Sequence, residues 1–255
     1  MILNKFNLKG KVAIVTGAST GLGQGMVKGL AEAGCNIVGV DYVKMDETEE
    51  LVNNTGNKFY GIVKDLINTN KDDLINLVNE AVKHFGKIDI LVNNAGIIRR
   101  EPSLEFSEKN WDDVLNINLR TVFFLSQAAA NQFVKQESKG KIINIASMLS
   151  FEGGILVPSY TASKSGVKGI TMTMANEWGK YGINVNAIAP GYMATNNTLP
   201  IRQDPIREQE IVKRIPANRW GTPEDLAGTA VFLASDNSDY INGFTIAVDG
   251  GWLAR

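Results

Sequence analysis

Residues 11–23 read Lys-Val-Ala-Ile-Val-Thr-Gly-Ala-Ser-Thr-Gly-Leu-Gly, and this stretch decides the fold. Its first five residues form a short apolar run, which is typical of a buried parallel strand. A loop containing Gly17, Gly21 and Gly23 follows directly and leads into a helical pattern. Glycines permit close backbone approach, and a helix N-terminus offers free N–H groups to a pyrophosphate. The alternative is a tight turn without a ligand, but a strand before the glycines and a helix after them favour a dinucleotide-binding loop.

The rest of the chain continues this alternation of strands and helices. Apolar runs predict strands at 11–15, 36–40, 59–63, 88–92, 141–146, 183–188 and 244–248. Helical spacing predicts helices at 22–34, 72–85, 110–135, 160–178 and 223–234. Polar residues and the prolines at 200, 205 and 216 indicate a loop with a short helix over the site at about 190–216. Regular β-α alternation without a linker predicts the α/β class. We expect one Rossmann-type domain over 1–255, with a doubly wound parallel sheet and helices on both faces.

Composition limits the possible function classes. The chain has 44% hydrophobic and 21% charged residues, as expected for a globular protein with a full core. A formal net charge of −1 argues against a nucleic-acid partner, which would require a basic excess. No apolar run approaches the ~18 residues of a membrane span, and the N-terminus does not resemble a signal peptide. Cys35 is the only cysteine, so no internal disulfide can form, and we expect this residue to be apolar filler. The absence of a disulfide fits a reducing cytoplasm, and we expect a cytoplasmic protein without membrane partners.

Polar residues follow three of the predicted strands. Asp41 closes the second strand, at the distance expected for the acidic residue that binds the adenosine ribose. A carboxylate there accepts hydrogen bonds from ribose hydroxyls and repels a 2′-phosphate, so NAD is favoured over NADP. Asp65 could face the adenine edge, and Asn93 opens a small polar turn suited to lining a cofactor groove. Each of the three could instead only cap or turn the chain, and Lys44 lies close to Asp41 in the sequence.

Tyr160 and Lys164 are four residues apart in a predicted helix, so both side chains lie on one helix face. A free phenol has a pKa near ~10 and is a poor acid or base at neutral pH. A neighbouring cation stabilises the phenolate and lowers that pKa, which makes the oxygen useful in proton transfer. Two residues on an ordinary solvated face are the alternative. The glycine loop and Ser147, which ends an apolar run, favour a catalytic pair.

The glycine loop, the Asn-Asn-Ala-Gly turn at 93–96, Asn118, Ser147, the Tyr160 and Lys164 pair and Pro190-Gly191 together resemble the short-chain dehydrogenase/reductase family. The resemblance covers essentially the whole chain and accounts for the Gly-x-x-x-Gly-x-Gly spacing, which departs from the generic dinucleotide motif. It implies a catalytic tetrad. Tyr160 would be the acid/base, and Lys164 would lower its pKa and hold the nicotinamide ribose. Ser147 would orient the substrate oxygen, and Asn118 would hold a water in the proton relay.

The same resemblance implies that Met193 and Thr195 contact the nicotinamide carboxamide. Together with the loop and strand-end residues, the expected cofactor site is Gly17, Thr20, Gly21, Leu22, Gly23, Asp41, Asp65, Asn93, Lys164, Met193 and Thr195.

Further segments, at 93–102, 144–154, 157–167, 186–198, 214–226 and 248–255, resemble the members of this family that act on deoxy-keto sugar acids. This resemblance implies NAD(H)-dependent hydride transfer to or from a secondary alcohol or ketone, in the breakdown of pectin-derived uronates. Ser147 is one expected contact of the substrate. Arg99 and Arg100 could bind a substrate carboxylate, although either could be a solvated surface residue. Asn196 and Asn197 could contact hydroxyls or be ordinary loop residues.

Other functions remain open within and outside the enzyme class. A gluconate or polyol dehydrogenase and a 3-oxoacyl reductase are the alternatives within the family. A non-catalytic NAD(H)-sensing protein on the same fold is the alternative outside it, and the intact tetrad disfavours it. His84 is the only histidine, so with one cysteine we expect no metal site. The apolar C-terminus at 250–255 and the family resemblance imply packing against a neighbouring subunit in a homotetramer.

Overall fold

Seven parallel strands form the centre of the protein in the computed structural model, which describes residues 1–255. The strands are β1 (Val12–Thr16), β2 (Asn36–Asp41), β3 (Phe59–Val63), β4 (Ile90–Asn93), β5 (Gly140–Ile145), β6 (Ile183–Pro190) and β7 (Thr245–Val248). Their order across the sheet is β3-β2-β1-β4-β5-β6-β7, so the chain starts near the middle and builds outward in both directions. The predicted doubly wound parallel sheet is confirmed, and the carboxyl ends of all its strands share one edge.

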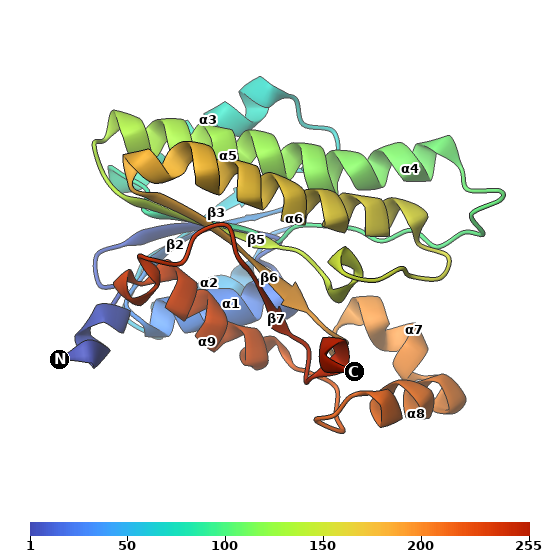
Figure 1. Ribbon diagram of the computed structural model, residues 1–255. Coiled ribbons are helices and arrows are strands. Elements are labelled where there is room, and N and C mark those ends of the chain that lie inside the picture. Colours follow the sequence, from blue (N-terminus) through green and yellow to red (C-terminus); the bar gives the residue numbers. More distant parts are fainter.

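Helices cover both faces of this sheet (Figure 1). One face carries α1 (Gly21–Glu32), α2 (Asp46–Asn53) and α9 (Pro223–Ala234). The other carries α3 (Lys71–Phe85), α4 (Glu108–Leu115), α5 (Thr121–Lys135) and α6 (Pro158–Trp178). Two further helices, α7 (Leu199–Arg202) and α8 (Pro205–Arg214), follow β6 and lie beside the C-terminus, outside both layers (Figure 1).

The two faces of the sheet bury separate layers of apolar side chains, because successive residues of a strand point to opposite faces. In β1, Val12 and Ile14 pack in the layer of α3 and α5, whereas Ala13 and Val15 pack in the layer of α1 and α9. Every residue of β1 is buried. Burial on both faces explains why these parallel strands read as continuous apolar runs in the sequence.

Glycines in α1 let this helix pack closely against α9. A Cβ on Gly25 would lie 2.5 Å from Pro223 Cβ, and one on Gly29 would lie 2.8 Å from Ala227 Cβ. Neither position has room for a methyl group, so a larger residue would force the two helices apart. This contact fixes the position of α1, whose N-terminus lies at the carboxyl edge of the sheet.

The structure differs in detail from the elements that the sequence predicts. The apolar pattern indicates no helix at 46–53, because only Thr48 and Val52 of α2 are buried. The helix expected at 110–135 is interrupted by one wide π-helical turn at 116–120, in which Thr121 N–H donates to Asn116 O. The single short helix expected at about 190–216 is two helices, α7 and α8. Cys35 is buried and unpaired, as predicted for apolar filler.

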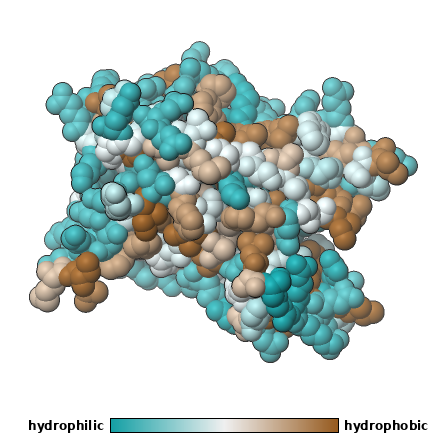
Figure 2. All heavy atoms as spheres, viewed as in Figure 1, coloured by the Kyte–Doolittle hydropathy of each residue, from teal (hydrophilic) through white to brown (hydrophobic).

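One face of the molecule combines α6 with the edge strand β7. Figure 2 shows hydrophobic residues gathered across the middle of this view, with hydrophilic residues along much of its outline. Among the exposed apolar residues of α6 and of the approach to β7 are Met172 and Phe244, which are 44% and 61% exposed. No helix of the chain has the length and apolar character needed to cross a bilayer.

Candidate active site

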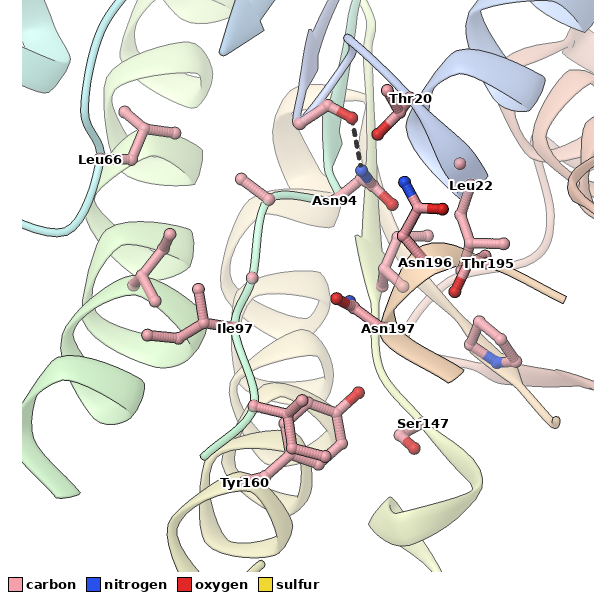
Figure 3. Close-up of a pocket in the computed structure, with 18 of the residues that line it drawn as sticks. Thr20, Leu22, Leu66, Asn94, Ile97, Ser147, Tyr160, Thr195, Asn196 and Asn197 are labelled. Atoms are coloured by element: carbon pink, nitrogen blue, oxygen red, sulfur yellow. Dashed lines mark hydrogen bonds between the residues drawn. The ribbon is translucent and has the colours of Figure 1, made fainter. Parts of the chain in front are cut away.

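A cavity of about 830 Å³ opens at the carboxyl edge of the sheet. It lies where β1 and β4 are neighbours, the point at which the strand order reverses, and open α/β sheets bind their ligands there. Its walls come from the loops that follow β1 to β6 (Figure 3). This volume is typical of a site that encloses a large part of a small-molecule ligand.

The glycine loop after β1 has a backbone that other residues would strain. Gly17 and Gly21 have φ of +66° and +59°, in the left-handed region. A Cβ on Gly23 would lie 1.9 Å from Gly17 O, so only glycine lets α1 begin this close to the loop. Thr20, the N-cap of α1, makes no side-chain hydrogen bond to the first turn. The first N–H groups of α1 therefore have no side-chain acceptor and fit the pyrophosphate of a dinucleotide.

Asn94 fastens this loop to the end of β4. Its Nδ2 donates to Thr16 O at 3.0 Å and to Gly17 O at 3.1 Å. Thr16 Oγ1 accepts from the backbone N–H groups of Asn94 and Ala95, both at 3.0 Å. Figure 3 shows Asn94 next to the glycine loop in the cavity wall. These bonds hold the ends of two adjacent strands in a fixed relation to the ligand space.

Asp41 lines the cavity at the end of β2 and is 7% exposed. Its Oδ2 accepts from Ser19 N–H at 2.9 Å, and its Oδ1 accepts from Tyr42 N–H at 2.8 Å. The two bonds fix the carboxylate and leave each oxygen with lone pairs for a ligand hydroxyl. A phosphate group at the same place would meet a fixed negative charge.

Ser147, Tyr160 and Lys164 meet in the same cavity. Ser147 follows β5, and its Oγ accepts from Leu149 N–H at 3.1 Å. Tyr160 and Lys164 project from successive turns of α6. Lys164 Nζ donates to Ile145 O at 2.5 Å and lies 5.6 Å from the centroid of the Tyr160 ring. Figure 3 shows the Tyr160 and Ser147 side chains facing the same space, where one substrate oxygen could contact both.

Burial shifts the pKa values of two of these groups. It lowers the pKa of Lys164 to about 8, because the ammonium loses its hydration. It raises the pKa of the Tyr160 phenol, while the Ser147 hydroxyl and the positive charge of Arg100 act in the opposite direction. The groups that act to lower the pKa of Tyr160 in this structure are Ser147 and Arg100, so the effect expected of Lys164 stays a prediction. The ammonium is directed to Ile145 O, and burial of the phenol outweighs the nearby charges.

Comparison with known proteins agrees with this geometry. A family model described as enoyl-(acyl carrier protein) reductase matches residues 17–253. The solved structure of a short-chain type dehydrogenase/reductase from Mycobacterium marinum is 32% identical, with a TM-score of 0.94 and 100% of both chains covered. The chain belongs to the short-chain dehydrogenase/reductase family.

Two other members of the family are more similar in sequence. The 2-dehydro-3-deoxy-D-gluconate 5-dehydrogenase of Dickeya dadantii is 66% identical over 255 residues, which is 100% of both chains. A solved structure from Agrobacterium tumefaciens with bound NADP is 50% identical, covers 99% of this chain and 100% of its own, and has a TM-score of 0.90. The similarity thus extends from the glycine loop through the segment at 190–216 to the C-terminus.

Most of the site residues predicted from the sequence line the one cavity. They are Gly17, Thr20, Gly21, Leu22, Asp41, Asp65, Arg99, Arg100, Ser147, Tyr160, Lys164, Met193, Thr195, Asn196 and Asn197. Gly23, Asn93 and Asn118 lie behind its wall and are absent from its lining. Asp65 also caps a turn, since its carboxylate accepts from Ile67 N–H at 2.9 Å.

Asn93 is turned away from the cavity. It is 3% exposed, and its Nδ2 donates to Ser126 Oγ at 2.9 Å and to Asn144 Oδ1 at 2.8 Å. The next residue, Asn94, lines the cavity instead, because neighbouring residues at a strand end point in opposite directions. The sequence indicates a polar turn here, but it does not indicate which asparagine faces the ligand.

Asn118 lies fully buried inside the wide turn at 116–120. Its Oδ1 accepts from Ile97 N–H at 2.9 Å, and its Nδ2 donates to Ile97 O at 2.9 Å and to Ser163 Oγ at 3.2 Å. The amide therefore joins the loop after β4 to α6, the helix of Tyr160. Both amide hydrogens are used, so a water could bind only to the remaining acceptor atoms of this residue.

Arg99 and Arg100 differ in their surroundings although both line the cavity. Arg99 is half-buried, and its guanidinium donates to Ile98 O at 3.4 Å. Arg100 is exposed and makes no hydrogen bond or ion pair within the chain. Its positive charge acts to lower the pKa values of both Tyr160 and Tyr192. Arg100 is thus an unpaired cation near the proposed catalytic phenol.

The apolar part of the cavity wall has no clear signal in the sequence. Ile97, Ile98 and Ile117 line the cavity, but an isoleucine at these positions cannot be told from a core residue in the sequence.

No group of three or more His, Cys, Asp and Glu side chains is arranged to hold a metal ion. His84 lies in the last turn of α3 and stacks on Tyr60, with the ring centroids 4.0 Å apart.

Proposed function

We propose that this protein is a nicotinamide-dependent oxidoreductase that interconverts a secondary alcohol and a ketone of a deoxy-keto sugar acid. The proposed reaction is that of 2-dehydro-3-deoxy-D-gluconate 5-dehydrogenase, in the breakdown of pectin-derived uronates. The observation that supports it most strongly is the 66% identity, over the whole chain, to a relative of that name. The cavity that contains Ser147, Tyr160 and Lys164 supports the reaction type.

The proposed chemistry divides between the cofactor and four side chains. A bound nicotinamide accepts or supplies the hydride. During oxidation the phenolate form of Tyr160 takes the proton of the substrate hydroxyl, and during reduction the phenol form returns that proton. Ser147 hydrogen-bonds the same oxygen and orients it. Lys164 holds the nicotinamide ribose, and its positive charge favours the phenolate and offsets part of the effect of burial. Asn118 holds a relay water through its free acceptor atoms.

We infer that NAD is the preferred cofactor. Asp41 supports this, because its fixed carboxylate suits ribose hydroxyls and opposes a 2′-phosphate. The solved structure of the relative from Agrobacterium tumefaciens contains NADP, so it does not support a preference for NAD. The inferred preference for NAD therefore depends on Asp41 alone. The proposed contacts of the cofactor also include Met193, Thr195 and five residues that line its groove, Gly17, Thr20, Gly21, Leu22 and Asp65. Gly23 and Asn93 lie behind the wall and shape the groove without lining it.

We propose that Arg100 holds the carboxylate of the substrate. An unpaired guanidinium at the cavity can form a bidentate pair with a carboxylate. Arg99 is the less suitable of the two, because it is half-buried and directed to the backbone of Ile98. Asn197 lines the same cavity and is proposed to contact a substrate hydroxyl.

A substrate panel read by NADH absorbance tests this proposal. The panel contains 2-dehydro-3-deoxy-D-gluconate, gluconate and an acetoacetyl thioester. We expect the highest kcat/KM for 2-dehydro-3-deoxy-D-gluconate. A higher value for gluconate or for the thioester would assign the protein to another branch of its family.

We further propose that the chain acts as a single domain in a cytoplasmic homotetramer. The continuous sheet and the family resemblance support these proposals, and exposed apolar residues such as Phe244 and Met172 support an interface. Native mass spectrometry tests the assembly, with a mass of four chains as the expected result.

A further inference from the structure

Glu152 joins three segments of the chain. It lies in the loop after Ser147, and its Oε1 accepts from Trp252 Nε1 at 2.7 Å while its Oε2 accepts from Arg214 at 3.3 Å. The guanidinium carbon of Arg214 lies 3.8 Å from the centroid of the Trp252 ring. Arg214 is the last residue of α8, and Trp252 begins the C-terminal turn. Each of these three side chains contacts the other two, and we call them the Glu152 cluster.

The cluster combines interactions that reinforce one another. The side chains of Glu152 and Arg214 are 27% and 50% exposed, and an ion pair at such exposure contributes little by itself. Here the same carboxylate also binds an indole N–H, and the guanidinium stacks on the indole. Trp252 is 5% exposed and packs in one apolar cluster with Ile211 and Ile215. The polar contacts therefore lie over a packed apolar junction.

The Glu152 cluster holds one end of a segment whose other end lines the cavity. After β6, Met193 and Asn197 are in the cavity wall, whereas Arg214 is bound in the cluster. Tyr192 connects the cavity wall to the cluster. It precedes Met193 in the chain, and its ring centroid lies 4.8 Å from that of Trp252. The C-terminal segment adds two hydrogen bonds. Ala217 N–H donates to Gly250 O at 2.9 Å, and the Arg255 guanidinium donates to Lys213 O at 2.8 Å.

We propose that the Glu152 cluster positions the substrate side of the cavity. By binding α8 to the C-terminal turn and to the loop of Ser147, it holds the residues at 193–197 in the cavity wall. Glu152, Arg214 and Trp252 are positioning residues, since none of them lines the cavity. The effect on catalysis rests on the proposed function, whereas the effect on the mobility of α7 and α8 does not. Met193 and Thr195 of this segment are also proposed to contact the nicotinamide, but the glycine loop that would bind the pyrophosphate is built separately, so NADH affinity should fall much less than substrate affinity.

The test uses Glu152→Gln, Arg214→Met and Trp252→Phe in the full chain. The matched control is Glu210→Gln, which breaks the exposed Arg207–Glu210 pair at 3.0 Å on the same helix. Hydrogen–deuterium exchange at 199–214 is measured on the protein alone. KM and kcat for 2-dehydro-3-deoxy-D-gluconate and the Kd for NADH are measured on the same samples.

We expect faster exchange at 199–214 in the three cluster variants and not in the control. We expect KM to rise about 3- to 10-fold, the effect of one hydrogen bond, while kcat falls less and the Kd for NADH stays within about 2-fold. The double variant Glu152→Gln/Trp252→Phe should show less than the product of the two single effects on KM.

Equal exchange in the wild type and the cluster variants would overturn the proposal. So would faster exchange with an unchanged KM, or an equal loss of substrate and NADH affinity, which indicates general destabilisation. If the wild type does not oxidise this sugar acid, the proposed function fails, while the exchange measurement still decides whether the cluster restrains α7 and α8.

Discussion

Lys164 Nζ lies 5.6 Å from the centroid of the Tyr160 ring, on the next turn of α6, and donates a hydrogen bond to Ile145 O at 2.5 Å. The hydrogen bond directs a buried cation to the end of β5, beside the loop of Ser147. The same burial lowers the pKa of Lys164 to about 8. This site therefore retains a lysine whose charged form is costly to bury, and the cost should be measurable.

The stability cost of Lys164 should depend on pH. Below pH 8 the lysine is protonated in the folded and the unfolded protein, and the burial penalty is fully present. From pH 8 up to the ordinary pKa of 10.5 the unfolded chain binds more protons, so the free energy of unfolding rises with pH. Relative to Lys164→Met, the wild type should gain on the order of 2–3 kcal/mol between pH 8 and pH 10, measured by urea unfolding. A pH-independent difference would mean that the pKa is not lowered.

Gly23→Ala should damage the cofactor loop. The added Cβ would lie 1.9 Å from Gly17 O and 2.6 Å from Asn94 Nδ2, so the loop and α1 must separate. We expect NADH affinity to fall more than about 10-fold and the free energy of unfolding to fall by about 1–3 kcal/mol. Gly228→Ala in α9 is the control, because nothing lies within 4 Å of its Cβ position. If Gly23→Ala binds NADH with the Kd of the wild type, the close contact between this position and Gly17 O would be refuted.

Cofactor preference should follow the charge of Asp41. The wild type should use NAD better than NADP, and Asp41→Ser should narrow the ratio of their kcat/KM values by about 10-fold, which corresponds to ~1.4 kcal/mol. Asp41→Asn keeps an acceptor for Ser19 N–H and isolates the effect of charge. A wild type that prefers NADPH would show that Asp41 does not select the cofactor.

Much of this fold and site can be predicted because parallel strands bring distant polar residues to one edge. Asp41 and Ser147 follow apolar strands, and both line the cavity. Periodicity predicts less well where few side chains are buried, which is why it indicates no helix at 46–53. Periodicity also places the end of a strand only to within one residue. For this reason Asn93 is predicted to line the cavity, whereas the residue that lines it is Asn94.

The electrostatic state of the site depends on burial, which residue spacing does not specify. A spacing of four residues places Tyr160 and Lys164 on one face of α6, as predicted. It does not indicate that the ammonium is directed to Ile145 O or that burial raises the pKa of the phenol. The contact of Glu152 with Trp252 joins residues 100 positions apart and has no local pattern in the sequence.

Selectivity for an acidic substrate should depend on Arg100. Loss of a charge-assisted hydrogen bond of about 1.5–3 kcal/mol corresponds to roughly 10- to 150-fold in kcat/KM for the acid. Arg100→Met should show this loss and discriminate poorly against a neutral analogue, whereas Arg99→Met should change little. If only Arg99→Met loses the discrimination, the roles are reversed; if neither does, the carboxylate is bound elsewhere.

The most direct test of the central claim is NADH formation from 2-dehydro-3-deoxy-D-gluconate by the wild type and by Tyr160→Phe. The substitution removes only the hydroxyl that is proposed to exchange a proton with the substrate. We predict that the wild type reduces NAD with this acid, and that kcat of the variant falls by about 10²–10⁴-fold while its Kd for NADH is unchanged. Turnover by Tyr160→Phe close to that of the wild type would contradict the account.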